Sequence, residues 1–422
     1  MGEFVNMHRF VFGRIVTAAL FLAGIVSAQD RRAVPDREPG HVRAHAWIKD
    51  NGRGGGGPDA PVKQAPPRLP AGFWPTDMLT AYGITANGGH GATVAIVDAY
   101  DSPNALADLN TFSMQFGLPG FPAASGAPCT PTFTKVNQAG LSATATLPKR
   151  NSGWEVEINL DTQWVHAIAP CANIVLVEAT SSNTSDLLTA VNYAKTVASV
   201  VSMSWGGNES RGEGSSDSTF VNTGVTFMAS SGDSGAGTEW PAASPNVIGV
   251  GGTQLSVASS GGLASPFTET AWNGSGGGCS SIEAALSFQK SFLPASPVCH
   301  GRGVPDVSMS GGDVSAVAVQ VSLQGGWFEV YGTSLSVQLF AGVTAIANGL
   351  RATPLNGTLA DLYADAVGAP TGTPYISNYR DITGYYSGER SGVFPVVKGW
   401  DFVTGLGSPL VNSLVYGYLL HQ

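Results

Sequence analysis

Ser334 is a candidate nucleophile in this sequence. It lies in Gly332-Thr333-Ser334, just ahead of an apolar segment with helical periodicity over 337–350. At a helix N-terminus the free backbone amides and the helix dipole stabilise negative charge, which suits a nucleophile. A serine before a helix is also a common helix cap, and the local sequence alone favours that interpretation.

Glu157 and Asp161 form a pair of carboxylates on a predicted helix over 154–168. A spacing of four residues stacks them on one face, where two like charges repel unless they are exposed or share a proton. An exposed acidic face is the common case, but Ile158 and Leu160 leave this helix little polar surface. If buried, the pair could supply a general base whose pKa is tuned by its neighbour.

No histidine is placed to activate Ser334 in a conventional Ser-His-Asp arrangement. His166 ends the 154–168 helix beside an apolar turn, and His90 precedes the first strand, at the opposite end of the sheet. The others are His8, His41 and His45 in the signal and leader, His300 beside a cysteine, and His421 next to the C-terminus. Glu157 and Asp161 are therefore the leading source of a base.

Short β-branched strands alternate with helices through the middle of the chain. The predicted strands are 92–98, 174–178, 199–203, 225–229 and 247–250, and helices are predicted at 102–115, 154–168 and 186–197. This alternation predicts an α/β fold with a mainly parallel sheet between two layers of helices. Asp233 follows a strand in a glycine-rich turn, at the carboxyl edge where such sheets hold their active sites. An aspartate in such a turn is usually a turn former.

The composition is typical of an exported, loop-rich protein. Of 422 residues 12% are charged, 55 are glycine, and the formal net charge is −9 with no basic patch, which gives no case for nucleic-acid binding. Residues 1–28 form a signal peptide ending in Val26-Ser27-Ala28. We expect a secreted or periplasmic protein without stable membrane association after signal cleavage, and a monomer.

Two further segments complete the predicted organisation. Residues 29–67 mix Arg, Pro and Gly and predict a flexible leader, whereas residues 68–422 form the folded domain. In an oxidising compartment four cysteines predict two disulfides, with three possible connectivities. We favour the local pairs Cys129 with Cys171 and Cys279 with Cys299.

Seven motifs in order resemble the sedolisins, the serine-carboxyl peptidases of subtilisin-like fold. They are Glu157-x-x-x-Asp161 with Ala169-Pro170, Ser202-Met203-Ser204-Trp205-Gly206, Ser231-Gly232-Asp233-Ser234-Gly235, Trp240 to Pro245 with Val250 to Thr253, Val304 to Ser308, Gly332-Thr333-Ser334, and Gly399 to Pro409. The resemblance covers roughly residues 68 to 420.

The resemblance implies a role for each matching residue. Ser334 would be the nucleophile, Glu157 the general base, Asp161 its orienting carboxylate, and Asp233 a protonated donor to the oxyanion, which requires acid. Substrate backbone would lie along Ser204, Trp205 and Gly206, with the side chain before the scissile bond near Ser231 and Gly232. One structural Ca²⁺ would be held by Asp381, Ile382, Val397, Gly399 and Asp401, with Val397 where a glycine is usual. Asp98 resembles the strand-end aspartate of subtilisins and is expected to be structural.

Two departures from the family pattern stand out. A long pro-domain is usual, but only about 40 residues separate the signal from the folded domain here. Gln338 stands where Pro is usual, four residues after the serine, and removes no reacting group.

Three functions remain open on these observations. The first is a secreted endopeptidase that hydrolyses polypeptides at acidic pH through an acyl-enzyme on Ser334. The alternative is a non-catalytic secreted peptide-binding protein that retains the fold. A third is a serine hydrolase acting near neutral pH through His166 or His90.

Overall fold

The computed structural model describes residues 1, 30–34, 41–50, 70–85, 88–257, 267–294, 299–369, 371–386 and 394–415. The predicted signal peptide lies outside these ranges except for its first residue. In the described part of the chain, no helix is both long and apolar enough to cross a membrane.

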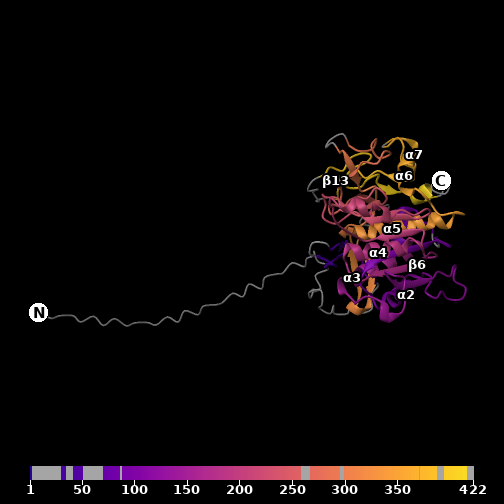
Figure 1. Ribbon diagram of the computed structural model, residues 1–422. Coiled ribbons are helices and arrows are strands. Elements are labelled where there is room, and N and C mark those ends of the chain that lie inside the picture. The colour runs from indigo at the N-terminus through magenta and orange to yellow at the C-terminus, as the bar shows by residue number, and fades with distance from the viewer. Residues whose placement is uncertain are drawn as a thin grey trace.

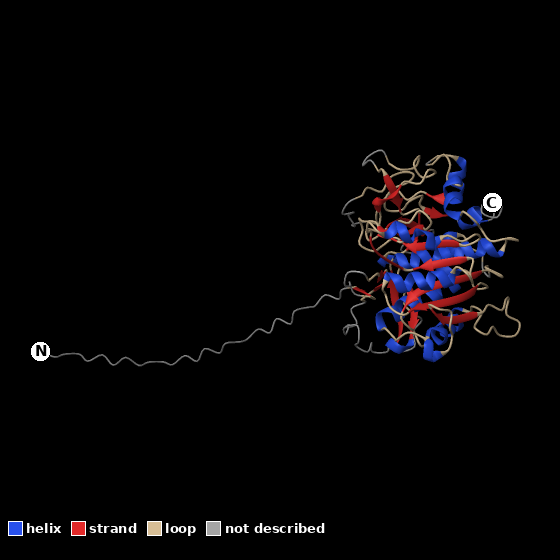
Figure 2. Cartoon of the chain, in the orientation of Figure 1, coloured by secondary structure: helices blue, strands red, loops and turns tan. Residues whose placement is uncertain are grey.

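An eight-stranded sheet runs through the middle of the domain (Figure 2). Its path is β12-β11-β9-β7-β4-β6-β5, with β15 pairing β11 off that path. All pairings are parallel except that of β12 with β11. The strands are β4 (Thr93–Ala99), β5 (Phe133–Asn137), β6 (Asn173–Ala179), β7 (Val200–Met203), β9 (Thr226–Ser230), β11 (Ile248–Val257), β12 (Phe267–Ala271) and β15 (Val307–Ser310).

Successive side chains of the strands enter two different cores, because they alternate between the faces of the sheet. Ile96 of β4 packs in the core that contains α3 (Ser152–Ile168) and α5 (Thr333–Gly349). Its neighbour Val97 packs in the core beneath α4 (Thr184–Ala194). The sheet thus lies between two helical layers, and the predicted subtilisin-like α/β class is confirmed (Figure 1).

The remaining elements flank these layers. In Figure 1, α2 lies at one end of the molecule, and α6, α7 and β13 lie at the other. The helices are α1 (Pro75–Tyr82), α2 (Ala105–Phe116), α6 (Thr358–Ala364), α7 (Thr373–Asn378) and α8 (Val411–Ser413). The strands are β8 (Trp205–Asn208), β10 (Glu239–Trp240), β13 (Gly278–Ala284), β14 (Gly301–Val304), β16 (Val317–Val321), β17 (Gly326–Tyr331), β18 (Tyr379–Arg380) and β19 (Ser408–Pro409).

Part of the predicted flexible leader is folded against the domain. Within 29–67, β1 (Arg31–Arg32), β2 (Arg43–Ala44) and β3 (Trp47–Ile48) are strands. Strand β2 pairs antiparallel with β8, and β3 pairs with β1 and β17. These parts are ordered because their backbone groups complete ladders whose other strands come from distant segments, which local composition does not reveal.

Both disulfides join the cysteines that lie closest in sequence. Cys129 bonds Cys171 with an S–S distance of 2.03 Å, and Cys279 bonds Cys299 at 1.98 Å. The predicted local pairing is confirmed.

Candidate active site

Ser334 is the second residue of α5 and is not the helix cap. The cap position is Gly332, whose φ of 136° lies in a region that favours glycine. The Ser334 side chain is fully buried, and its hydroxyl donates to the Ser204 carbonyl oxygen over 3.5 Å. The hydroxyl is therefore turned toward the end of β7 and not back onto its own helix.

Glu157 and Asp161 are fully buried in α3, so an exposed acidic face is the wrong interpretation of this pair. The helix begins after Asn151, whose side chain accepts hydrogen bonds from the amides of Gly153 and Trp154 at 3.0 and 3.2 Å. From Trp154 onward every residue of α3 is buried, and the helix packs along α5. Because α3 packs along α5, both carboxylates lie next to the first turns of α5.

Burial is the main cause that raises the pKa of both carboxyls well above their ordinary values. The nearby charge of Asp98, also fully buried at the end of β4, raises both further. Ser334 and Asp161 are close enough to act on the pKa of Glu157, yet neither Glu157 oxygen has a partner with hydrogen-bond geometry among the described residues. Asp161 accepts a hydrogen bond from Gln338 at 2.6 Å through Oδ2.

Asp233 follows β9 and reaches the first turn of α5. Its Oδ1 accepts hydrogen bonds from the backbone amide and the hydroxyl of Thr333, both at 2.8 Å. Its Oδ2 is buried without a partner among the described residues. Burial raises the pKa of Asp233 to about 6, although the charge of His45 and the bonds from Thr333 oppose the rise. A protonated Asp233 would present an O–H donor at Oδ2.

The backbone of His45 lies directly on this group. Its carbonyl oxygen accepts a hydrogen bond from the Ser334 amide at 3.2 Å, and its amide donates to the Ser204 carbonyl at 3.2 Å. A β-carbon on Gly332 would lie 2.0 Å from the His45 carbonyl oxygen and 2.8 Å from Asp233 Oδ2. Because Gly332 has no β-carbon, the His45 carbonyl oxygen and Asp233 Oδ2 can both lie close to its backbone.

The five residues expected to bind substrate fall on two sides of this segment. Strand β2 places Arg43 opposite Gly206 and Ala44 opposite Trp205, and His45 continues onto Ser204. Ser231 and Gly232 follow β9 into the turn that carries Asp233. A β-carbon on Gly232 would lie 2.9 Å from the Glu239 carboxylate. The turn that carries Asp233 therefore packs against the Glu239 side chain.

Three site residues were missed or given no role by the sequence interpretation: His45, Glu239 and Gln338. His45 was set aside with the leader, and Glu239 was passed over although it directly precedes the Trp240 to Pro245 motif. Gln338 was noted only as a lost proline. A carboxylate next to a family motif is the one signal that could have been used for Glu239.

Neither alternative histidine lies near Ser334. The ring of His166 contacts the Pro119 carbonyl oxygen at 2.8 Å and packs against Phe121, and burial lowers its pKa to about 4. His90 lies beside Gly349, at the far end of α5 from Ser334, roughly 24 Å along a helix of that length. Neither His166 nor His90 is therefore placed to act as a base for the neutral hydrolase.

The residues expected to hold calcium gather in one loop region near the C-terminus. Asp381 Oδ1 accepts hydrogen bonds from the Gly399 amide at 3.0 Å and the Tyr375 hydroxyl at 3.1 Å. Asp401 Oδ2 accepts one from the Val397 amide at 3.1 Å. Burial raises the pKa of both carboxyls, that of Asp401 to about 6.

The donor set fits a hard cation. Among the described residues no amide or side chain bonds the carbonyl oxygens of Ile382, Val397 or Gly399, which leaves them available as ligands. Tyr100 is the one described non-glycine residue with a positive φ, so the Val397 backbone suits a β-branched residue. Two carboxylates and three carbonyls match the oxygen ligands of Ca²⁺. No group of three or more His, Cys, Asp or Glu side chains with metal-binding geometry occurs in the part of the chain described.

Comparison with known proteins decides the family. Residues 139–360, just over half of the chain and including Glu157, Asp233 and Ser334, match the subtilase family. The chain belongs to the subtilase family.

Its sequence relatives are sedolisins, the group that the motifs predicted. Kumamolisin from Bacillus sp. (strain MN-32) is 31% identical over 83% of this chain and 64% of its own length. Sedolisin from Pseudomonas sp. (strain 101) is 26% identical over 94% of this chain and 66% of its own. The chain thus spans slightly less than two thirds of these relatives.

A solved structure supports the subtilisin-like fold. Pseudomonas sedolisin, a serine-carboxyl proteinase complexed with two molecules of pseudo-iodotyrostatin, superposes with a TM-score of 0.67 at 25% identity. The match covers 83% of this chain and 98% of that structure. The likeness to this sedolisin structure therefore extends over most of the chain.

Proposed function

We propose that this member of the subtilase family is a secreted serine-carboxyl endopeptidase that hydrolyses polypeptides at acidic pH through an acyl-enzyme on Ser334. The observation that carries this proposal is the 3.2 Å hydrogen bond from the Ser334 amide to the His45 carbonyl oxygen. A peptide carbonyl held by the amide of a buried serine, at a helix N-terminus, is in the position of a carbonyl about to be attacked. The predicted signal peptide and the sedolisin relatives support the rest.

The proposed reaction uses four side chains. Glu157 in its ionised form takes the proton of the Ser334 hydroxyl as the oxygen attacks the carbonyl carbon, and returns that proton to the departing amine. Asp161 orients Glu157. Protonated Asp233 and the Ser334 amide donate to the oxyanion, and a water molecule then hydrolyses the ester by the same steps in reverse.

The titration of Asp233 sets the alkaline limit of the working range, and the raised pKa of Glu157 sets its acid limit. Asp233 must be protonated to donate, and its pKa is about 6 because it is buried, so this group works below that pH. An ionised Asp233 would repel the oxyanion, whereas a protonated one donates to it. Glu157 must instead be ionised, so the two requirements bound the active range from opposite sides.

We also propose one structural Ca²⁺ at Asp381 and Asp401, with the carbonyls of Ile382, Val397 and Gly399. The ion would tie the loop of Val397 to Asp401 against Asp381, and it would take no part in the reaction. Its support is the set of free carbonyl oxygens beside two carboxyls whose pKa is raised by burial.

The test is hydrolysis of an unfolded protein at pH 3 to 8 by the wild type and by Ser334→Ala. Ser336→Ala is a matched control, because Ser336 lies on the same helix but bonds the Met309 and Ser310 carbonyls at 3.1 and 3.2 Å. We expect acid-range activity that Ser334→Ala abolishes and Ser336→Ala retains. Equal hydrolysis by the Ser334 variant would refute the proposal, and a complete lack of hydrolysis by the wild type would favour the peptide-binding alternative.

A further inference from the structure

We propose that Ser275 and Gly276 are positioning residues for Asp233. They lie in the connection between β12 and β13, residues 272–277, here called the backing loop. Through this loop they hold residues 231–238, here called the Asp233 turn, so that the Asp233 carboxyl group meets the oxyanion. The inference rests on the proposed peptidase function and adds two residues that act on the reaction only through Asp233.

The bonds from α5 fix only one side of the Asp233 turn. Asp233 Oδ1 accepts both of its hydrogen bonds from Thr333. The Thr333 hydroxyl also lies 3.2 Å from the amide nitrogen and 3.2 Å from the carbonyl oxygen of Gly232. The proposed donor atom, Oδ2, has no partner among the described residues. Its position therefore depends on what holds the backbone of the turn from the other side.

The backing loop is bonded to that other side through backbone groups. The Gly276 amide donates to the Gly232 carbonyl oxygen at 2.8 Å. Further along, the Gly235 amide donates to the Gly274 carbonyl oxygen at 2.9 Å. Because Gly232 directly precedes Asp233, the bond from Gly276 is the one that bears most directly on the carboxyl group.

Glycine at position 276 lets the two segments lie in contact. A β-carbon there would lie 2.3 Å from the Ser231 carbonyl oxygen and 2.8 Å from the Gly232 α-carbon. Both obstructing atoms belong to the backbone, so they cannot rotate away as the end of a side chain could. A larger residue at 276 must therefore push the start of the Asp233 turn away from the backing loop.

Ser275 ties the backing loop to the central sheet. Its side chain is buried, and its hydroxyl accepts a hydrogen bond from the Gly252 amide at 2.9 Å and donates one to the Val403 carbonyl oxygen at 2.8 Å. Gly252 belongs to β11, in which the Val250 carbonyl oxygen accepts a hydrogen bond from the Ser231 amide at 3.0 Å. The same strand thus fixes the start of the Asp233 turn and, through Ser275, the loop behind it. Alanine at 275 would deprive a buried amide and a buried carbonyl of this partner.

The backing loop also affects how easily Asp233 ionises. Burial raises the pKa of Asp233 to about 6, against the charges of His45 and Arg32. Its own charge in turn raises the pKa of Glu157 and of Tyr331. The backing loop carries no charged side chain, so it acts on Asp233 through burial alone. A loop that moved away and admitted water would therefore lower the pKa of Asp233 toward its ordinary value of 3.8.

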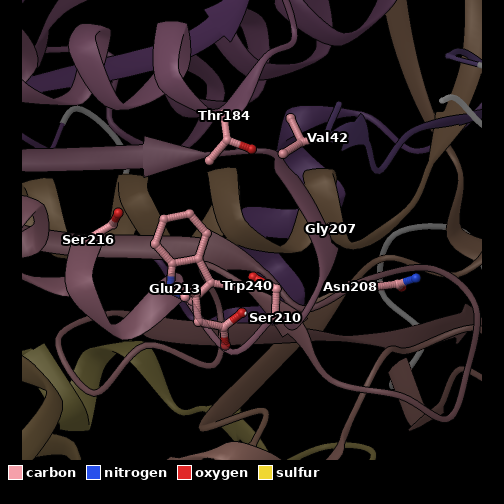
Figure 3. A pocket seen from close by; sticks show the side chains of 9 residues that line it. Val42, Thr184, Gly207, Asn208, Ser210, Glu213, Ser216 and Trp240 are labelled. Atoms are coloured by element: carbon pink, nitrogen blue, oxygen red, sulfur yellow. Dashed lines mark hydrogen bonds between the residues drawn. The ribbon is translucent and has the colours of Figure 1, made fainter. Parts of the chain in front are cut away.

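The backing loop does not line the cavity beside β8, the strand along which substrate is expected to lie. This cavity of about 290 Å³ is lined by residues that include Gly207, Glu213 and Trp240, and by none of residues 272–277 (Figure 3). Loss of an interaction made only in the transition state lowers kcat and kcat/KM together. Changes at 275 and 276 should therefore reduce kcat much more than they alter KM.

The test measures kcat and KM between pH 3 and 8 on a fluorogenic peptide whose sequence the wild type cleaves in an unfolded protein. Ser275→Ala removes hydrogen bonds and adds no atom, whereas Gly276→Ala adds a methyl group and removes no side-chain bond. We expect both to lower kcat about tenfold at pH 4.5, which is less than the cost of about 10²–10³ for outright loss of an oxyanion donor. Both should also move the alkaline limb of the kcat/KM profile to lower pH. The two changes perturb the loop in different ways, so either variant that folds decides the question.

Ser308→Ala is the matched control. Ser308 is buried, and its hydroxyl donates to the Thr404 carbonyl oxygen at 3.1 Å, so this change removes a similar bond to the segment that contains Val403. In the described part of the chain this hydroxyl bonds neither the backing loop nor the Asp233 turn. We expect its kcat and its pH profile to match those of the wild type, with kcat calculated per folded molecule from thermal unfolding of each protein.

The same changes are then made in Asp233→Ala. If the backing loop acts through Asp233, each change should cost less than about twofold in this background. A full tenfold cost there would show that the loop acts elsewhere and would overturn the inference. Unchanged kcat and pH limb in both single variants, beside wild-type hydrolysis that Ser334→Ala abolishes, would also overturn it and leave the proposed function intact. A wild type without hydrolysis overturns both.

Discussion

Gln338 Nε2 lies 2.6 Å from Asp161 Oδ2 and donates a hydrogen bond to it inside the fully buried core. The same nitrogen donates to the Ser204 hydroxyl at 2.9 Å. The residue that stands in place of the expected proline therefore joins α5 to the carboxylate pair of α3. Since a donor favours the ionised form of a carboxyl, Gln338 is a positioning residue that keeps Asp161 available as an acceptor.

Gln338→Leu should weaken catalysis most strongly in acid. Loss of the donor raises the pKa of the coupled pair Glu157 and Asp161, so the acid limb of the kcat/KM profile should move up by about one to two pH units, as expected for a hydrogen bond to a charged group. A uniform loss of activity at every pH would instead indicate a packing role only.

Asp233→Asn should remove the alkaline fall in activity. Asp233 donates only when protonated, and its pKa is about 6, so wild-type activity should decline as pH rises through that value. An asparagine can keep the acceptor for Thr333 and donate from its amide at any pH. The ratio of kcat/KM at pH 7 to that at pH 4.5 should increase, whereas Asp233→Ala should cost about 10²–10³ in kcat at pH 4.5, where the wild-type residue is protonated. An unchanged ratio in the asparagine variant would argue against Asp233 as the titrating donor.

Asp98→Asn should stabilise the protein above neutral pH and not in acid. Burial raises the pKa of Asp98 from 3.8 to about 8, and neither of its oxygens has a partner among the described residues. A carboxyl that binds its proton more tightly when folded contributes stability below pH 4 and loses it as pH rises toward 8. We expect a gain of about 1–3 kcal/mol at pH 8 by urea unfolding. A gain of equal size at pH 4 would contradict this explanation.

Removal of calcium should lower thermal stability without changing the chemistry. A ligand that binds only the folded state at a hundred times its Kd stabilises by about 2.7 kcal/mol. Thermal unfolding with and without chelator measures this effect, and the double change of Asp381→Asn with Asp401→Asn should abolish it. A melting temperature indifferent to both chelator and added Ca²⁺ would remove the proposed ion.

Side-chain patterns in the sequence predicted the sheet, the main helices and the carboxylates near Ser334. Buried strands such as 92–98 carry apolar, partly β-branched runs, and α3 and α5 carry two of the seven motifs that resemble the sedolisins. These features are local, so each can be recognised from its own residues. The spacing of Glu157 and Asp161 also predicted a shared face, although local sequence favoured an exposed one.

What the sequence did not predict depends on contacts between distant segments. Residues 41–48 have no periodic apolar pattern, and their backbone pairs with β8 and β17, which lie more than 150 residues away. The contact of the His45 carbonyl with Ser334 leaves no side-chain signature at all. Glu239 gains its meaning only once Arg43 and His45 are placed against it.

The proposed reaction requires that Ser334 form an acyl-enzyme with Glu157 as its base. The most direct measurement is intact-mass spectrometry of protein quenched in acid during turnover of a peptide p-nitrophenyl ester. We expect a single acyl adduct on Ser334 in the wild type, which is absent from Ser334→Ala and forms much more slowly in Glu157→Gln. An adduct of undiminished yield in Ser334→Ala, or turnover by the wild type without any adduct on that serine, would contradict it.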